Sequence, residues 1–240
     1  MANNDGLIEF GGDEGAPSDL GNNKFERFKA KKGESYQIGF VYWPAGPDGK
    51  PNLAAEMPKF LAGKRSYIKG VGYVINKGPE FTALADKKEE PQLKITTVIA
   101  LWPVKSNGQL DLERLKDGDF KIIPWTFGDT RFASLKALWR KGWPAGQHDI
   151  DAECKEEQFQ QLEMTPHKDA VLAKLANSEQ HQELYKSILA RIEACAKRLP
   201  KEIGANMSIQ DIREKLGISG PVSDNSLDMS NLDTNLDGLL

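Results

Sequence analysis

The stretch from residue 119 to residue 164 reads DFKIIPWTFGDTRFASLKALWRKGWPAGQHDIDAECKEEQFQQLEM, and it decides the fold that the sequence predicts. Its opening segment is apolar on both alternating faces, which is typical of a strand buried on both sides. Gly128 breaks this strand, and Asp129 is placed to cap a helix. Apolar residues then recur at helical spacing until Gly142 and Pro144 end the helix.

A second pair of extended segments follows this helix. Apolar residues alternate with acids from Ile150 to Cys154, and a polar turn follows. Phe159, Leu162 and Met164 then resume the apolar side. The whole stretch carries three of the five tryptophans of the chain. Basic residues lie among them, namely Lys121, Arg131, Lys136, Arg140 and Lys141. Aromatic rings mixed with cations indicate a surface on which bases stack.

The segments upstream also predict strands. One covers residues 34–43, and the β-branched run over residues 93–102 predicts a central strand. Between them, residues 64–78 predict a single strand with Tyr67, Lys69, Val71 and Tyr73 on one side, weakened by two glycines. Short strands, Gly-rich bends and one inserted helix together predict an α+β, β-rich fold with a strongly curved sheet or a partly open barrel.

The rest of the chain predicts a helical extension between two acidic ends. Helices are expected over residues 169–177, 178–199 and 208–216, with Ser178 capping the second. Ser208 and Asp211 match a capping box, and Gly217 ends that helix. We therefore divide the chain into a flexible acidic arm (1–23), a core (24–165), a helical extension (166–219) and a disordered acidic tail (220–240).

Charge is distributed unevenly along the chain, although the net charge is only −3. Residues 24–150 hold 22 Lys and Arg against 14 Asp and Glu. Residues 1–23 hold five acids and residues 216–240 hold four, and neither end contains Lys or Arg. A basic centre between acidic ends indicates a polyanion-binding core flanked by segments that compete with the ligand.

The acidic tail contains leucines that an inert linker does not need. Ser-Leu-Asp and two Asn-Leu-Asp units repeat within it, and the chain ends in Leu-Leu. Leucines four residues apart line one side of a helix that forms on binding, which predicts a short peptide for a groove on a partner. The alternative is a tail that only adds solubility. The predicted partner-binding residues are Leu232, Asp233, Leu236, Asp237, Leu239 and Leu240.

Composition and missing motifs exclude several classes of protein. No run is long enough to span a membrane, and the N-terminus lacks the pattern of a signal peptide, so we expect a soluble, cytosolic protein. Cys154 and Cys195 are expected to be free thiols. No nucleotide-binding loop, dinucleotide fingerprint, nucleophile elbow or metalloprotease helix is present, so we expect neither an enzyme nor a cofactor.

Histidine and cysteine are absent from residues 24–147, which disfavours a structural zinc site there. His148 with Asp149 and Asp151 forms a possible divalent-ion site. The interpretation that we prefer is a polar entry to a strand, and we predict no bound metal.

The binding prediction requires cations that follow phosphates and flat side chains that stack on bases. The candidate cations are Lys64, Arg65, Lys69, Lys77, Lys94, Lys105, Lys121, Arg131, Arg140 and Lys141. The candidate stacking rings are Trp43, Tyr67, Tyr73, Trp102, Trp125 and Trp143, of which two or three are expected to be stackers and the others core residues.

The order of these features resembles the single-stranded DNA-binding, helix-destabilising proteins of T-even and related bacteriophages. The resemblance covers about residues 33–165 and includes GESYQIGFVYWP, Trp-Thr-Phe-Gly at residues 125–128, the helix bearing Trp139, and the strands with Cys154 and Leu162. It implies an OB-like core without the zinc site of that family, and Trp125 as the first stacking residue. It also implies binding without strong sequence preference in the cytoplasm of an infected bacterium, possible self-association, and a C-terminal tail that recruits replication, recombination and repair proteins.

Two rival functions belong to other classes. A protein–protein adaptor or virion-associated structural protein would use the basic face for an acidic partner. A nuclease would need a cluster of metal-binding carboxylates. Salt-sensitive binding to oligo-dT favours the first hypothesis over the adaptor, and Mg²⁺-dependent cleavage of an oligonucleotide would favour the nuclease.

Overall fold

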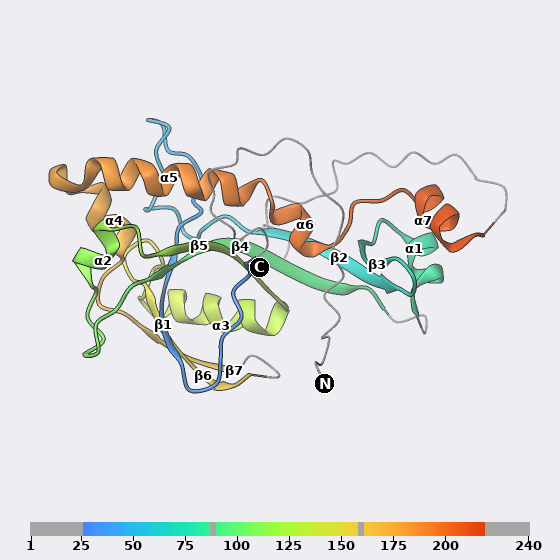
Figure 1. The fold of residues 1–240 in the computed structure, drawn as a ribbon, viewed down its shortest axis with the longest axis horizontal. Coiled ribbons are helices and arrows are strands. Elements are labelled where there is room, and N and C mark those ends of the chain that lie inside the picture. The colour runs from blue at the N-terminus through green and yellow to red at the C-terminus, as the bar shows by residue number, and fades with distance from the viewer. Residues whose placement is uncertain (1–25, 87–89, 158–160, 219–240) are drawn as a thin grey trace, which may run out of the picture.

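Strand β4 (Gln92–Trp102) organises the sheet within residues 26–86, 90–157 and 161–218, which the computed structural model describes (Figure 1). Its β-branched run is buried on both faces, and Thr96 and Thr97 are both fully inaccessible to solvent. Strand β5 pairs with one edge of β4, and strands β2 and β1 follow one another along the other edge. The predicted central strand over residues 93–102 is confirmed.

The seven strands form one antiparallel sheet in the order β3-β2-β4-β1-β6-β7, with β5 added to β4. The other strands are β1 (Ser35–Phe40), β2 (Leu61–Ile68), β3 (Gly72–Ile75), β5 (Lys121–Phe127), β6 (Ile150–Glu156) and β7 (Gln161–Pro166). The predicted α+β class is confirmed, and the sheet that the described residues form is not closed into a barrel.

The prediction of a single strand over residues 64–78 is wrong. The chain turns back after Ile68, where the Val71 amide donates to the Ile68 carbonyl oxygen at 3.0 Å. Gly70 and Gly72 have φ values of 85° and 100°, which side chains other than glycine rarely adopt. The two glycines therefore form a turn, and β2 and β3 become an antiparallel hairpin.

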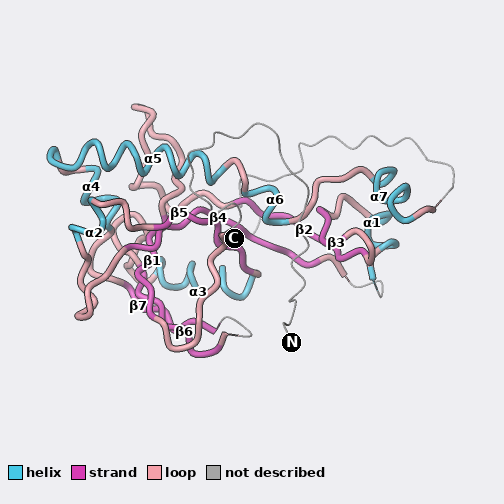
Figure 2. The backbone as a smooth tube through the Cα atoms, in the orientation of Figure 1, coloured by secondary structure: helices cyan, strands magenta, loops and turns pink. Residues whose placement is uncertain are grey.

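Helices cover both faces of the sheet (Figures 1 and 2). On one face, α5 contacts β4 and β5, α6 contacts β2, β3, β4 and β5, and α4 packs against α5. On the other face, α3 lies beneath β4. Helices α1 and α7 gather at the end of the molecule where β2 and β3 project. The helices are α1 (Pro79–Leu84), α2 (Leu112–Lys116), α3 (Asp129–Arg140), α4 (Val171–Ala176), the 3-10 helix η2 (Glu179–His181), α5 (Gln182–Ala196), α6 (Leu199–Ile203) and α7 (Ile209–Leu216).

Two hydrophobic clusters hold these layers together. The larger cluster joins the sheet to α3 and also contains apolar residues of α4, α5 and α6. The smaller cluster lies under the β2–β3 hairpin, where Ile68, Val71 and Val74 meet Phe81 of α1 and Ile212 of α7. Strand β4 borders both regions through its pairing with β1, β2 and β5. The hairpin is therefore supported by a core of its own.

Helix ends agree with the sequence in part. The capping box of Ser208 and Asp211 is confirmed, and Gly217 ends α7 in the left-handed conformation. Helix α3 is capped by Gly128, and the predicted cap Asp129 is its first residue. Ser178 precedes η2 and makes no side-chain capping bond. Prediction of that cap is wrong because a short 3-10 turn intervenes before α5 begins.

Both cysteines are free, as predicted, and both are buried. The predicted acidic arm and the tail residues 232–240 lie outside the described residues. In the described part of the chain, none of the helices combines the length and the apolar character needed to cross a membrane.

Candidate nucleic-acid interface

Tyr67 and Tyr73 are direct cross-strand partners on the β2–β3 hairpin. Their ring centroids lie 5.2 Å apart, and the ring planes meet at 64°. Each side chain is 43 % exposed, which is a large fraction for an aromatic residue. Two adjoining, half-exposed rings are the kind of surface on which unpaired bases can stack.

Arg65 lies on the same face, two residues before Tyr67 in β2. Its guanidinium carbon lies 3.9 Å from the centroid of the Tyr73 ring. Its Nε is buried and has no hydrogen-bond partner among the described residues. Burial lowers the pKa of Arg65, the Tyr73 hydroxyl opposes this shift, and the positive charge of Arg27 adds to it.

Lys94 extends this face onto β4. It pairs with Gly63, two residues before Arg65, so its side chain shares the face of Arg65. Burial lowers the pKa of the Lys94 ammonium group, the positive charge of Arg65 lowers it further, and Asp129 opposes both. We call Arg65, Tyr67, Tyr73 and Lys94 the hairpin face.

The predicted stacking roles of Trp43, Trp102 and Trp125 are wrong, because each ring is at most 5 % exposed. The Trp125 ring packs edge-on against Phe28, with 5.3 Å between the centroids. The Trp43 indole nitrogen donates to the Phe40 carbonyl oxygen at 2.8 Å. Helices cover both faces of the central sheet, so its rings are part of the core.

Trp143 is exposed, but it lies apart from the hairpin face. Its side chain is 40 % exposed and meets His148 edge-on at 4.9 Å between ring centroids. It follows the C-terminal end of α3, whereas Asp129 at the other end of that helix is the residue close enough to affect Lys94. Arg140 and Lys141 are exposed beside Trp143 and do not join the hairpin face.

Several other predicted cations are engaged elsewhere. Lys121 forms an ion pair with Glu26. Arg131 reaches toward the carbonyl oxygen of Leu162 in β7, at 3.5 Å. Lys121 and Arg131, which the sequence predicts as phosphate contacts, therefore face other partners and lie outside the group formed by Arg65 and Lys94.

Three more predicted cations belong to other places. Lys77 donates to the Met207 carbonyl oxygen at 3.2 Å. Lys105 lies in the turn between β4 and α2. Lys69 is exposed in the turn of the hairpin, so its predicted place on one strand face with Tyr67 and Tyr73 is wrong.

Lys64 projects from the opposite side of the sheet to Arg65, because neighbouring residues of a strand alternate. It borders an open groove with Asn76, Pro79 and Thr82. The Asn76 amide nitrogen donates to the hydroxyls of Ser66 and Thr82, and its oxygen accepts from the Gly78 amide. These bonds use the polar groups of the Asn76 side chain to shape the loop, so that side chain is not free to bind a ligand in the groove.

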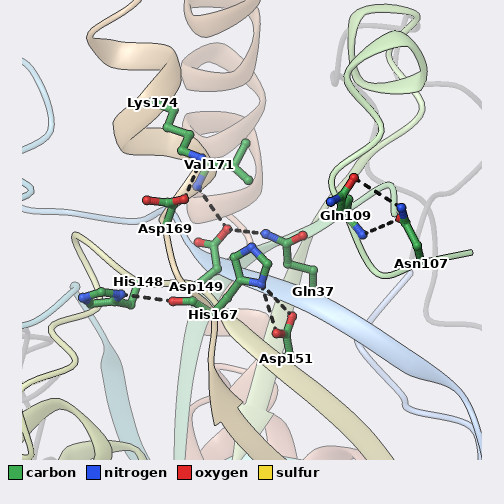
Figure 3. Close-up of polar contacts among 10 residues, drawn as sticks. All are labelled: Gln37, Asn107, Gln109, His148, Asp149, Asp151, His167, Asp169, Val171 and Lys174. Atoms are coloured by element: carbon green, nitrogen blue, oxygen red, sulfur yellow. Dashed lines mark hydrogen bonds and ion pairs between the residues drawn. The ribbon is translucent and has the colours of Figure 1, made fainter. Parts of the chain in front are cut away.

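The segment around Asp149, considered above as a possible ion site, instead forms hydrogen bonds within the protein (Figure 3). Asp149 is 1 % exposed, and its Oδ2 accepts from the Gln37 side-chain amide and from the Val171 backbone amide, each at 3.1 Å. The Trp102 indole N–H lies beside this carboxyl without good hydrogen-bond geometry. Burial raises the pKa of Asp149 to about 7, and the neighbouring donors oppose the shift.

The histidines next to Asp149 point to other partners (Figure 3). His167 Nδ1 lies 3.0 Å from Oδ2 of Asp151, and His148 Nδ1 lies 3.0 Å from the His167 carbonyl oxygen. Across the ranges that the structure describes, no three His, Cys, Asp or Glu side chains converge as a metal site would require. The interpretation as a polar strand entry fits these contacts.

No sequence pattern indicated that Arg27 lies close enough to the hairpin face for its positive charge to lower the pKa of Arg65. Arg27 belongs to the basic lead-in before β1, and its Nε lies 2.5 Å from the buried Glu202 carboxylate of α6. The pattern that places the tyrosines together is the pair of glycines at positions 70 and 72, interpreted as a turn. Comparison of the chain with protein-family models, with curated proteins and with solved structures found no match.

Proposed function

We propose that this protein binds single-stranded nucleic acid through the hairpin face. The observation that carries the proposal is the pair of half-exposed rings, Tyr67 and Tyr73, with the cations of Arg65 and Lys94 on the same side of the sheet. Exposed rings supply stacking for bases, and adjacent cations attract the backbone. A duplex hides the faces of its bases, so stacking favours an unpaired strand.

The wider proposal follows the resemblance to the phage helix-destabilising proteins. In it, the core is OB-like, and the protein coats unpaired DNA during replication, recombination or repair in the host cytoplasm. The tail residues 232–240 recruit other proteins of these processes. The hairpin face supports the DNA-binding part of this proposal, and it replaces Trp125 with Tyr67 as the principal stacking residue.

A titration of the full chain with a labelled dT oligonucleotide tests the proposal. We expect fluorescence anisotropy to show binding that weakens steeply between two salt concentrations, with weaker binding to a duplex of equal length. Replacing Tyr67 with Ala should weaken binding by about 1–3 kcal/mol if a base stacks on the ring.

Trp143→Ala is the matched control, because this ring is equally exposed but lies outside the hairpin face. Its affinity should equal that of the wild type. Unchanged affinity in a folded Tyr67→Ala, Tyr73→Ala double variant would overturn the assignment of the site. Absence of binding to any oligonucleotide at low salt would instead favour the adaptor hypothesis.

A further inference from the structure

The cations of the hairpin face lack the acidic partners that many other surface cations have. Lys121, Lys155 and Lys174 each form an ion pair with a carboxylate. Arg65 and Lys94 form no ion pair within residues 26–86, 90–157 and 161–218. Two partly buried cations that form no ion pair are unfavourable in the free protein and favour an anionic ligand.

The orientation of Arg65 is fixed by an aromatic ring. Its guanidinium lies over Tyr73 at 3.9 Å, so one face of the Tyr73 ring is already covered. A guanidinium stacked on a ring keeps its N–H donors at its edges, where they remain able to bind phosphate oxygens. The Tyr73 ring also meets the Tyr67 ring in an edge-type contact, which further limits the space for a base at Tyr73.

The charges around Arg65 are mutually repulsive. The positive charge of Arg27 lowers the pKa of Arg65, and the positive charge of Arg65 lowers the pKa of Lys94. Glu202 is engaged with Arg27 at 2.5 Å, and Asp129 acts on Lys94 from the start of α3. A phosphate placed between Arg65 and Lys94 would reverse this repulsion.

We propose, on the basis of the function proposed above, that Arg65 and Lys94 form a phosphate-binding site and that Tyr73 positions Arg65. Tyr67 then stacks on the base, while Arg65 and Lys94 bind the neighbouring phosphodiester. Tyr73 is a positioning residue in this arrangement, because one face of its ring holds the Arg65 guanidinium.

The dependence of affinity on salt separates phosphate contacts from stacking. Each phosphate contact to a single strand contributes about 0.7 to the slope of log K against log salt concentration. We therefore expect Arg65→Ala and Lys94→Ala each to reduce the slope by about 0.7. Tyr67→Leu should lower affinity and leave the slope unchanged, and Lys105→Ala, an exposed lysine in a distant turn, is the control.

The positioning role of Tyr73 is tested by comparing a variant that removes the ring with one that keeps it. Tyr73→Leu should reduce the slope as Arg65→Ala does, and Tyr73→Phe should restore it because the ring remains. The Arg65→Ala, Tyr73→Leu double variant should bind no more weakly than Arg65→Ala alone. If Tyr73→Leu instead weakens binding at an unchanged slope and adds to Arg65→Ala, Tyr73 stacks on a base and its positioning role is wrong.

Inorganic tripolyphosphate serves as a second probe, measured by calorimetry with the same folded variants. Binding that is lost in Arg65→Ala and Lys94→Ala supports the phosphate site even if oligo-dT does not bind, and in that case the proposed function fails. Oligo-dT binding with unchanged salt slopes in both variants overturns the phosphate site and leaves the proposed function standing. If the wild type binds neither probe, both proposals are wrong.

Discussion

Trp125 shows how one residue type serves two opposite purposes. An indole next to a Phe-Gly sequence suits a stacking surface, yet the same apolar ring also fills a core. Its position in β5, under helices on both sides of the sheet, decides for the core. The alternation of the sequence indicated two apolar faces for this strand, but it contained no information on which rings the helices would cover.

Replacing Trp125 with Ala should lower the free energy of unfolding by about 3–5 kcal/mol, because it leaves a cavity among Phe28, Phe40 and Phe127. Urea unfolding followed by circular dichroism measures this loss. The fraction that stays folded at low temperature should bind oligo-dT as the wild type does. Weaker binding with unchanged stability would return Trp125 to the interface.

Asp149 predicts a pH dependence of stability. Its carboxyl has the ordinary aspartate pKa of 3.8 in the unfolded chain and a pKa of about 7 in the folded protein, because folding buries it. Between these values the folded state keeps a proton that the unfolded state has lost, so the free energy of unfolding decreases as pH rises. The contribution is complete below pH of about 4 and is lost as pH rises through about 7.

The Asp149→Asn variant isolates this effect, since it is uncharged at every pH and keeps an acceptor oxygen for the Val171 amide. Chemical denaturation from pH 4 to pH 8 should show that the wild type loses stability relative to the variant as pH rises. A constant difference between the two proteins would show that Asp149 titrates normally.

The β2–β3 hairpin is the element that sequence reasoning interpreted least well. The strands over residues 93–102 and 120–127 and the capping box of α7 were predictable, because long alternating runs and capping residues are local patterns. Alternation also continues through a turn when glycines replace side chains, so residues 64–78 were interpreted as one strand. Cross-strand pairing of Tyr67 with Tyr73 follows only once the turn is known.

Gly70→Ala should destabilise the hairpin by about 1–2 kcal/mol, because alanine is strained at a φ of 85°. Oligo-dT binding should weaken, since the turn aligns the two tyrosines. Gly49→Ala, at a φ of 74° in another loop, should cost similar stability and leave binding unchanged. Equal affinities for both variants would contradict the role of the hairpin.

At the scale of the whole molecule, the C-terminal part of the described chain supports the hairpin face. The Ala205 amide donates to the Tyr73 carbonyl oxygen at 2.9 Å, and the Ile75 amide donates to the Ala205 carbonyl oxygen at 3.0 Å. Ile212 of α7 is fully buried in the smaller cluster. These contacts are long-range, so the sequence patterns predicted the helix α7 but not its place beneath the candidate interface.

Two truncations of the full chain separate support of the hairpin by the C-terminal residues from competition of the acidic tail with the nucleic acid. Removing residues 221–240 should leave DNA binding intact or tighter, because four negative charges are lost while α7 remains. Removing residues 205–240 should weaken binding, because the edge of β3 and the smaller cluster lose their partners. Affinities at low salt, with circular dichroism as a folding check, measure both effects. Weaker binding after the shorter truncation would contradict competition by the tail.

Strand β4 has a mechanical consequence for the molecule. It pairs with β2 at one end and with β1 at the other, so one continuous strand joins the β2–β3 hairpin to the main core. Backbone amides along β4 should exchange with deuterium more slowly after single-stranded nucleic acid is bound, including amides far from any contact with the nucleic acid. Binding at the hairpin would thereby reduce local opening of the backbone at the centre of the protein.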